Sequence, residues 1–293
     1  MTRITEFDRT SWSGGSPVTA ASPSAVAESL ECGDVLFLPA LPFRVLPEES
    51  SLFSPEILST AKNASFDPRS GRVGGATVSG ADLERLRGLM QRFSEQAAAL
   101  VDALLPPYRG RLQQARTSFR PAEIAGRPSS WRKDDTRLHV DAFPASPVQG
   151  RRILRVFSNV HPSGRARSWR VGAEFEGLVD RFAKTLSLPW PGQAAVLRAL
   201  HITKSHRTPY DALMLQLHDR MKEDAVYQKD TPQTVVDFPA GTTWLTFTDQ
   251  VSHAAMAGQY QLEQTFLLPV DAMLEENRSP LRMLERRLGK RLA

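Results

Sequence analysis

The pattern of apolar positions predicts mainly helices and loops in the first part of the chain. Apolar residues recur at three- and four-residue steps over residues 82–105, which predicts a long helix that two consecutive prolines end. A shorter helical pattern begins at Ser24, and the apolar run 34–41 that follows it predicts a buried strand. Residues 44–80 are rich in Pro, Ser, Asn and Gly and predict loops.

From about residue 115 the pattern changes to short runs that are typical of strands and are separated by turn residues. These runs cover residues 115–121, 136–143, 151–160, 234–239, 242–249 and 261–270. Two helical patterns, at about 173–186 and 209–223, interrupt the series. Short strands with helices on one flank predict an α+β domain built on a β-sandwich or barrel, because a parallel α/β sheet would need helices alternating with the strands.

Composition narrows the class of protein without identifying it. The chain has 293 residues, of which 41% are hydrophobic and 24% charged, a balance typical of folded globular proteins. Its one cysteine, Cys32, excludes a disulfide framework and a cysteine-ligated zinc site. No apolar run reaches the roughly 18 residues that a transmembrane helix needs. The polar N-terminus lacks the apolar core of a secretion signal, so we expect a cytoplasmic protein.

The excess positive charge is confined to the C-terminal tail. The formal net charge is +5, and residues 278–293 carry six basic side chains and one acidic one. The rest of the chain is therefore balanced, which argues against a body that binds nucleic acid. We expect three parts: a loose lead-in over residues 1–24, one domain over 25–277 with its β-rich core at about 115–270, and the tail.

The tail has the pattern of a basic amphipathic helix. Leucines follow helical steps on one face and cations lie on another: Leu281, Leu284, Leu288 and Leu292, and Arg282, Arg286 and Lys290. Such a helix either lies on an anionic membrane surface or packs on the domain with its charged side in water. The pattern leaves both alternatives open.

The candidate chemistry centres on His139 and Asp141, which lie two residues apart in a predicted strand and so project from the same face. A third ligand is available from His253, which follows another predicted strand far along the chain. Two His and one carboxylate form the facial triad of non-haem Fe(II) oxygenases, which leaves coordination positions open for an oxo acid and dioxygen. The alternative is that both His are ordinary residues at strand ends. His218 lies in a helical pattern and is most simply a surface or half-buried side chain.

An oxo-acid co-substrate also needs a cation for its distal carboxylate, ideally a guanidinium. Arg155 shares a strand face with Phe157 and Asn159, and an inward Arg or Asn needs a partner. Arg120, just ahead of the expected metal strand, is a second candidate. The alternative for both arginines is a structural salt bridge to an acid such as Glu263.

Longer segments carry a resemblance to a known family. They are GDVLFLPALPF (33–43), SFRPAEIAGRPSSWRKDDTRLHVDAFPASP (118–147), GRRILRVFSNVHP (150–162) and TTWLTFTDQVSHAAMAGQYQLEQTF (242–266). Over roughly residues 30–275 the chain resembles the bacterial Kdo 3-hydroxylases, within the Fe(II)/2-oxoglutarate-dependent dioxygenases. The resemblance implies a double-stranded β-helix (jelly-roll, cupin-like) core with flanking N-terminal and inserted helices. It also implies hydroxylation of carbon 3 of the Kdo sugar (3-deoxy-D-manno-oct-2-ulosonic acid) of a lipopolysaccharide precursor, Kdo-lipid A, to give Ko.

The resemblance assigns roles to particular residues. It implies Fe(II) ligands at His139, Asp141 and His253, and 2-oxoglutarate and O2 as co-substrates. Co-substrate contacts would fall on Arg155, with Arg120 and Asn159 as further candidates. Many members of the wider superfamily carry a cation on the strand after the last His, where this chain reads Gln-Leu-Glu-Gln over 261–264. This departure favours Arg155 as the anchor.

An acidic glycolipid substrate would require a basic entrance to the site. The loop cations that the sequence offers for it are Arg132, Lys133, Lys204, His206 and Arg207, each of which has solvated surface charge as its alternative. A glycolipid substrate also makes contact of the tail with the inner face of the cytoplasmic membrane reasonable. The competing functions are the same chemistry on another small metabolite or lipid, a non-catalytic metal-binding jelly roll that binds sugars, and a zinc hydrolase.

Overall fold

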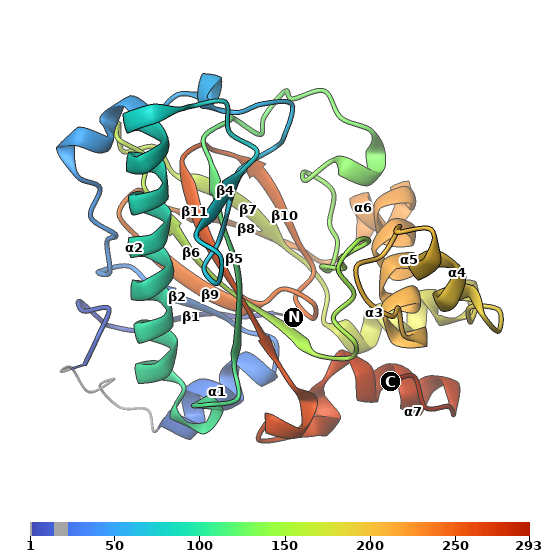
Figure 1. Cartoon of the computed structure of the whole chain (residues 1–293). Helices are drawn as coiled ribbons and strands as arrows, with labels where there is room; N and C mark the ends of the chain where they lie inside the picture. The colour runs from blue at the N-terminus through green and yellow to red at the C-terminus, as the bar shows by residue number, and fades with distance from the viewer. Residues whose placement is uncertain (1, 15–22) are drawn as a thin grey trace.

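The computed structural model describes residues 2–14 and 23–293 and contains two β-sheets flanked by helices (Figure 1). The larger sheet has eight strands in the order β1-β2-β9-β6-β11-β5-β3-β4. Its strands are β1 (Ile4–Glu6), β2 (Val35–Leu38), β3 (Ala64–Asp67), β4 (Arg72–Gly74), β5 (Gln113–Arg120), β6 (Arg152–Asn159), β9 (Thr243–Phe247) and β11 (Gln261–Leu268). The smaller sheet has the order β10-β7-β8, from β7 (Arg167–Val171), β8 (Thr234–Phe238) and β10 (His253–Ala257).

Alternating side chains on the strands separate two apolar regions. On β6, Phe157 joins a cluster with Trp244 of β9 and with Trp169 and Phe238 of the smaller sheet, so this region lies between the two sheets. Leu154 lies three residues before Phe157 on β6 and points to the opposite face. It belongs to the main core on the outer face of the larger sheet. This alternation places Arg155 between the sheets, on the face that the sequence predicts for it.

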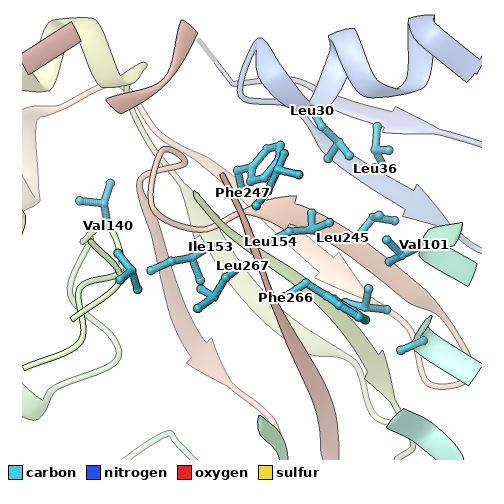
Figure 2. Packing of buried hydrophobic residues seen from close by; sticks show 14 of the residues in the cluster. Leu30, Leu36, Val101, Val140, Ile153, Leu154, Leu245, Phe247, Phe266 and Leu267 are labelled. Atoms are coloured by element: carbon cyan, nitrogen blue, oxygen red, sulfur yellow. The ribbon is translucent and has the colours of Figure 1, made fainter. Parts of the chain in front are cut away.

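Helices cover the outer face of the larger sheet. α1 (Pro23–Glu31) and α2 (Gly80–Leu104) pack there, and Figure 2 shows Leu30 and Val101 against Leu245 and Phe266. A second group of helices lies on the side of the molecule opposite α2 (Figure 1). It consists of α3 (Phe175–Phe182), α4 (Gln193–Ala199), α5 (Pro209–Glu223), α6 (Ala225–Asp230) and α7 (Pro280–Leu288).

The predicted fold class is confirmed, and so are the long helix, the helix at 209–223 and five of the six predicted strand regions. The prediction of a strand over 136–143 is wrong. That segment forms only an isolated bridge between His139 and His253 at the free edge of β10. A regular ladder does not continue, because the Leu138 N–H donates to the Gln228 side chain and the Asp141 N–H to the Thr248 carbonyl. β7 and β10 were not predicted, and neither was the hairpin of β3 and β4 within the expected loops.

The ends of the chain differ in part from the expectation. Residues 4–6 of the lead-in add a parallel strand beside β2, so this part is not loose. Residue 1 and residues 15–22 of the lead-in lie outside the described residues. In the tail, Leu281, Leu284 and Leu292 are buried, and Arg282 pairs with Glu276 and Glu285. The apolar face of the tail therefore packs on the domain, which is the second of the two alternatives that the sequence left open.

Within residues 2–14 and 23–293, no helix combines the length and the apolar character that crossing a bilayer requires.

Candidate metal centre

His139 and His253 are brought together by the backbone. The His139 N–H donates to the His253 carbonyl at 3.0 Å and the His253 N–H donates to the His139 carbonyl at 2.9 Å. Two residues on, the Asp141 N–H donates to the Thr248 carbonyl at 2.8 Å, which fixes the carboxylate on the same side. One ligand atom from each of His139, Asp141 and His253 lies within 4.8 Å of the other two. The predicted triad is therefore assembled at the end of β10, with the two His as direct neighbours.

The tautomer of each imidazole suits metal binding. His139 Nδ1 lies 2.7 Å from the Arg137 carbonyl, and His253 Nδ1 lies 2.8 Å from the Val251 carbonyl. A carbonyl only accepts, so each Nδ1 carries the hydrogen and each Nε2 keeps a free lone pair. Burial lowers the pKa of both imidazoles, well below the usual value for His139. Both rings are thus neutral and ready to act as ligands.

The carboxylate of the triad is ionised and incompletely satisfied. Burial alone would raise the pKa of Asp141, but the neighbouring Arg155 guanidinium outweighs this effect and lowers the pKa. Asp141 Oδ2 is buried and has no hydrogen bond, although Arg155 Nε lies 3.3 Å away without the alignment for one. A buried carboxylate oxygen without a donor beside two free imidazole nitrogens fits a divalent cation. The residues present therefore fit Fe(II).

Aromatic rings enclose the triad. Trp169 of β7 stacks on His253 with centroids 5.1 Å apart, and its indole N–H is buried without a partner. His218 of α5 packs edge-on against His139 at 5.3 Å and contacts Asp219 through Nδ1 at 2.9 Å. His218 is half-buried, as the sequence predicts, and the structure also places it beside the triad.

A cavity of about 120 Å³ between the two sheets contains the triad and three arginines. Arg155 Nη1 lies 3.0 Å from Glu263, and Arg120 Nε lies 3.1 Å from the same carboxylate. Glu263 stays ionised because these two arginines lower its pKa against the effect of burial. The predicted co-substrate arginines do line the cavity, but both are engaged in the salt bridge that was their alternative.

The third arginine of the cavity, Arg167, differs from the other two. It is 2% exposed, its Nη1 donates to the Gly258 carbonyl at 2.6 Å, and its Nε has no partner. Within the described part of the chain no acid lies within salt-bridge distance of it. Burial, with a contribution from Arg120, lowers its pKa to about 9, so it remains cationic at neutral pH. A buried cation with a free donor in this cavity is suited to an anionic ligand.

Sequence reasoning missed Arg167 and Trp169 because residues 167–171 were not recognised as a strand. The alternation in Arg-Ser-Trp-Arg-Val was the available signal, since it places Arg167, Trp169 and Val171 on one face. Asn159, in contrast, was predicted to contact the co-substrate but does not line the cavity. Its side chain donates to the carbonyls of Arg165 and Phe238 and accepts from the N–H of His161, so it holds the turn together and does not line the cavity. The structure thus gives Asn159 a structural role in place of the predicted co-substrate contact.

A larger groove of about 790 Å³ adjoins the cavity and shares Arg120, Arg155 and Glu263 with it. Its walls include six cations and two acids: Arg69, Arg116, Arg120, Arg151, Arg155 and Lys204, and Asp67 and Glu263. The groove is therefore positively charged, and it opens beside the triad.

The predicted substrate cations divide between this groove and the surface. Lys204 lines the groove, and the guanidinium of Arg207 donates to the Pro144 carbonyl at its wall. His206 follows closely in the chain and is exposed. Arg132 instead stacks on Trp131 and pairs with Asp219 at 3.1 Å, and neither Arg132 nor Lys133 is among the residues that line the groove or the cavity.

Comparisons with known proteins agree with this geometry. A family model described as 3-deoxy-D-manno-oct-2-ulosonic acid (Kdo) hydroxylase matches residues 15–291. A solved structure of the Kdo hydroxylase KdoO, a non-heme Fe(II) α-ketoglutarate-dependent dioxygenase in complex with α-ketoglutarate and Fe(III), is 48% identical. It has a TM-score of 0.95, and the match covers 100% of this chain and 98% of that one.

Two further structures of KdoO are similar to the same extent. The complex with cobalt(II) is 49% identical with a TM-score of 0.95, and the complex with succinate and Fe(III) is 48% identical with a TM-score of 0.94. Both matches cover 99% of this chain and 97% of the other. No curated protein sequence matches the chain.

Proposed function

The chain belongs to the Kdo hydroxylase family, and from this premise we propose that it hydroxylates carbon 3 of the Kdo sugar in Kdo-lipid A. It is an Fe(II)/2-oxoglutarate-dependent dioxygenase that uses O2. The observation that carries the proposal is the convergence of the three ligands, a buried unpaired arginine and a basic groove at one end of the two sheets.

His139, Asp141 and His253 would hold the iron. Bound Fe(II), together with 2-oxoglutarate and O2, supplies the oxidising chemistry that places one oxygen atom in a C–H bond and releases succinate and CO2. The chain keeps both imidazoles neutral through burial and orients each one through its backbone carbonyl. Arg155 keeps the Asp141 carboxylate ionised. These residues thus prepare the ligand set before any cofactor binds.

We assign the distal carboxylate of 2-oxoglutarate to Arg167. The assignment rests on its complete burial, its partnerless Nε and its place in the cavity that contains the triad. Arg155 and Arg120 share Glu263, so their charge is already partly neutralised, and we give them a supporting role. The Trp169 ring, stacked on His253, excludes water from this end of the cavity.

The groove next to the cavity suits the acidic substrate. Kdo carries a carboxylate and lipid A carries phosphates, so the excess of cations on the groove walls favours both. Lys204 has no ion-pair partner among the described residues and retains the substrate contact that the sequence predicts for it. We therefore propose that the sugar enters through this groove toward the triad.

We also propose a cytoplasmic enzyme that contacts the inner face of the cytoplasmic membrane. The tail over 278–293 can contribute charge to this contact through Arg286 and Lys290, which are not buried. Its apolar face packs on the domain instead of inserting into lipid, because Leu281, Leu284 and Leu292 are buried there and Leu288 is half-buried. Fractionation of cells that express the full chain tests both location and attachment.

Succinate release that depends on both Fe(II) and Kdo-lipid A tests the function directly. Turnover of 2-oxoglutarate that does not respond to Kdo-lipid A would favour another substrate. Metal binding without turnover would favour a sugar-binding protein, and activation by zinc with inhibition by iron would favour a hydrolase. The matched control for replacement of a triad histidine, such as His253→Ala, is His161→Ala. His161 lies outside the triad and contacts Arg165 and Ser163.

A further inference from the structure

An unusual surface lies on the far side of the helical group, where residues 187–204 project from the molecule around α4. Five of the eight large apolar side chains that are exposed in the described part of the chain belong to this projecting segment. They are Leu188, Trp190, Val196, Leu200 and Ile202, each between 43% and 65% exposed. Figure 1 shows α4 at the outer edge of the helices, away from both sheets.

The projecting segment is fixed at both ends, and most of its side chains between them are exposed. At its start, the Ser187 N–H donates to the Gln216 side chain at 2.9 Å and that side chain donates back to the Ser187 carbonyl at 2.8 Å. At its end, the Lys204 N–H donates to the Ala145 carbonyl at 2.9 Å. α4 has no buried residue, and its Val196 and the adjoining Leu200 are exposed. Exposed apolar side chains gathered on one segment indicate a surface that binds a partner.

The charge of the same region indicates which partner. Residues 181–210 contain five basic side chains and no acidic one. Arg181 pairs with Asp224, but Lys184, Arg198 and Lys204 are exposed and have no ion pair among the residues described. Large apolar side chains with cations around them, including a tryptophan, are typical of segments that enter the headgroup region of an anionic bilayer. A second copy of the chain fits poorly, because a symmetric contact would bring the cations of both copies together.

We propose that residues 187–204 dock the protein on a bilayer that contains anionic phospholipid, with Trp190 and Leu200 inserted among the headgroups. Lys204 at the end of the segment also lines the substrate groove, and the loop 143–147 that it contacts forms part of the groove wall. Docking through this segment brings the groove close to the lipid surface. The docking itself does not depend on the proposed function; only its use for a glycolipid does.

The end of the tail packs near the residues that follow the projecting segment. The Tyr210 N–H donates to the Leu292 carbonyl at 3.1 Å, which places the end of the tail next to the start of α5. The end of the tail therefore lies beside a residue that is a few positions along the chain from the end of the projecting segment. The segment supplies the apolar insertion that the packed tail lacks.

Binding of the full-length protein to vesicles tests the proposal. The vesicles are made of phosphatidylcholine with or without phosphatidylglycerol, and bound protein is measured by sedimentation. We expect binding to the anionic vesicles. The double variant Trp190→Ser with Leu200→Ser should lower the partition coefficient at least about tenfold, since two large side chains lose their burial. Lys184→Gln with Arg198→Gln should abolish most of the preference for anionic lipid.

The matched control is Val235→Ser with Leu274→Ser, which removes two equally exposed apolar side chains outside the segment. It should bind like the unchanged protein. Turnover on detergent-dispersed Kdo-lipid A should be unchanged in all variants. Equal vesicle binding by the Trp190 and Leu200 variant, or no binding by the unchanged protein, would overturn the proposal. So would a dimer in solution that this variant dissociates. Vesicle binding as expected without hydroxylation would leave the docking intact and remove the proposed function.

Discussion

The role of Arg167 leads to the sharpest prediction about the site. Replacing Arg167 with Gln removes the cation assigned to the distal carboxylate of 2-oxoglutarate and keeps a donor for the Gly258 carbonyl. Hydrogen bonds to charged groups contribute about 1.5–3 kcal/mol each, so the KM for 2-oxoglutarate should rise roughly 10- to 150-fold. Arg167→Lys should recover part of this loss.

The same substitution should not reduce stability much. Arg167 is fully buried without an ion pair, and its charge costs free energy in the folded protein. The melting temperature of Arg167→Gln should therefore stay close to that of the unchanged protein. Steady-state succinate formation at varied 2-oxoglutarate gives KM and kcat separately, and thermal unfolding gives the stability.

A matched control and a rival variant make the result decisive. Arg165→Gln changes the same residue type two positions earlier, where the side chain is exposed and contacts His161 and Gln259. It should leave the KM unchanged. If Arg155→Gln raised the KM for 2-oxoglutarate while Arg167→Gln left it unchanged, the anchor would be Arg155, as the sequence alone predicted, and the reasoning about burial would be refuted.

Three further predictions concern the metal, the fold near the site and its response to acid. His253→Ala should weaken Co(II) binding at least about 100-fold in a titration, and binding within a few-fold of the original would contradict the triad. Gly258→Ala should raise the KM for 2-oxoglutarate and lower stability by about 1–3 kcal/mol, because φ is +114° and the added Cβ would lie 2.9 Å from Arg167 Cδ; an unchanged KM would contradict this. Burial would raise the pKa of Asp135, but Arg120 and Lys62 lower it to about 2. The folded pKa is thus below the unfolded one, so about 2 kcal/mol of stability should be lost as the pH falls from about 4 to about 2; denaturant unfolding of Asp135→Asn should show a smaller loss.

The metal ligands could be predicted from the sequence because their spacing carries the information. Residues two apart in extended chain share a face, which was enough to pair His139 with Asp141 although no regular strand forms there. That His253 is the direct backbone partner of His139 could not be predicted, because the bridge joins segments that are distant in the sequence. A prediction based on local pattern cannot determine such long-range pairing.

The arginine that we assign to the distal carboxylate of 2-oxoglutarate could not be predicted from the sequence. Arg155 and Arg120 were good candidates by face and position. Strand register decides their partners: Glu263 of β11 pairs with Phe157 of β6 and with Ser118 of β5, which places its carboxylate between both arginines. The remaining unpaired arginine comes from a strand that the sequence analysis had not recognised.

The tail and the projecting segment show that the sequence pattern also could not predict which apolar side chains are exposed at the surface. The leucines of residues 278–293 gave a clear amphipathic pattern, yet a pattern alone does not say whether an apolar face meets the domain or a membrane. In the structure Leu281, Leu284 and Leu292 are buried and Leu288 is half-buried, whereas most of the exposed large apolar side chains lie around α4. The short helix α4 had no pattern strong enough to predict it.

The central claim is that this site hydroxylates the Kdo sugar of a lipopolysaccharide precursor. Mass spectrometry of Kdo-lipid A after incubation with the purified protein, Fe(II), 2-oxoglutarate and O2 tests it most directly. The account predicts a gain of one oxygen atom, located on carbon 3 of Kdo and matched by an equal amount of succinate. An unmodified sugar in a sample where iron is bound and 2-oxoglutarate is consumed would contradict it.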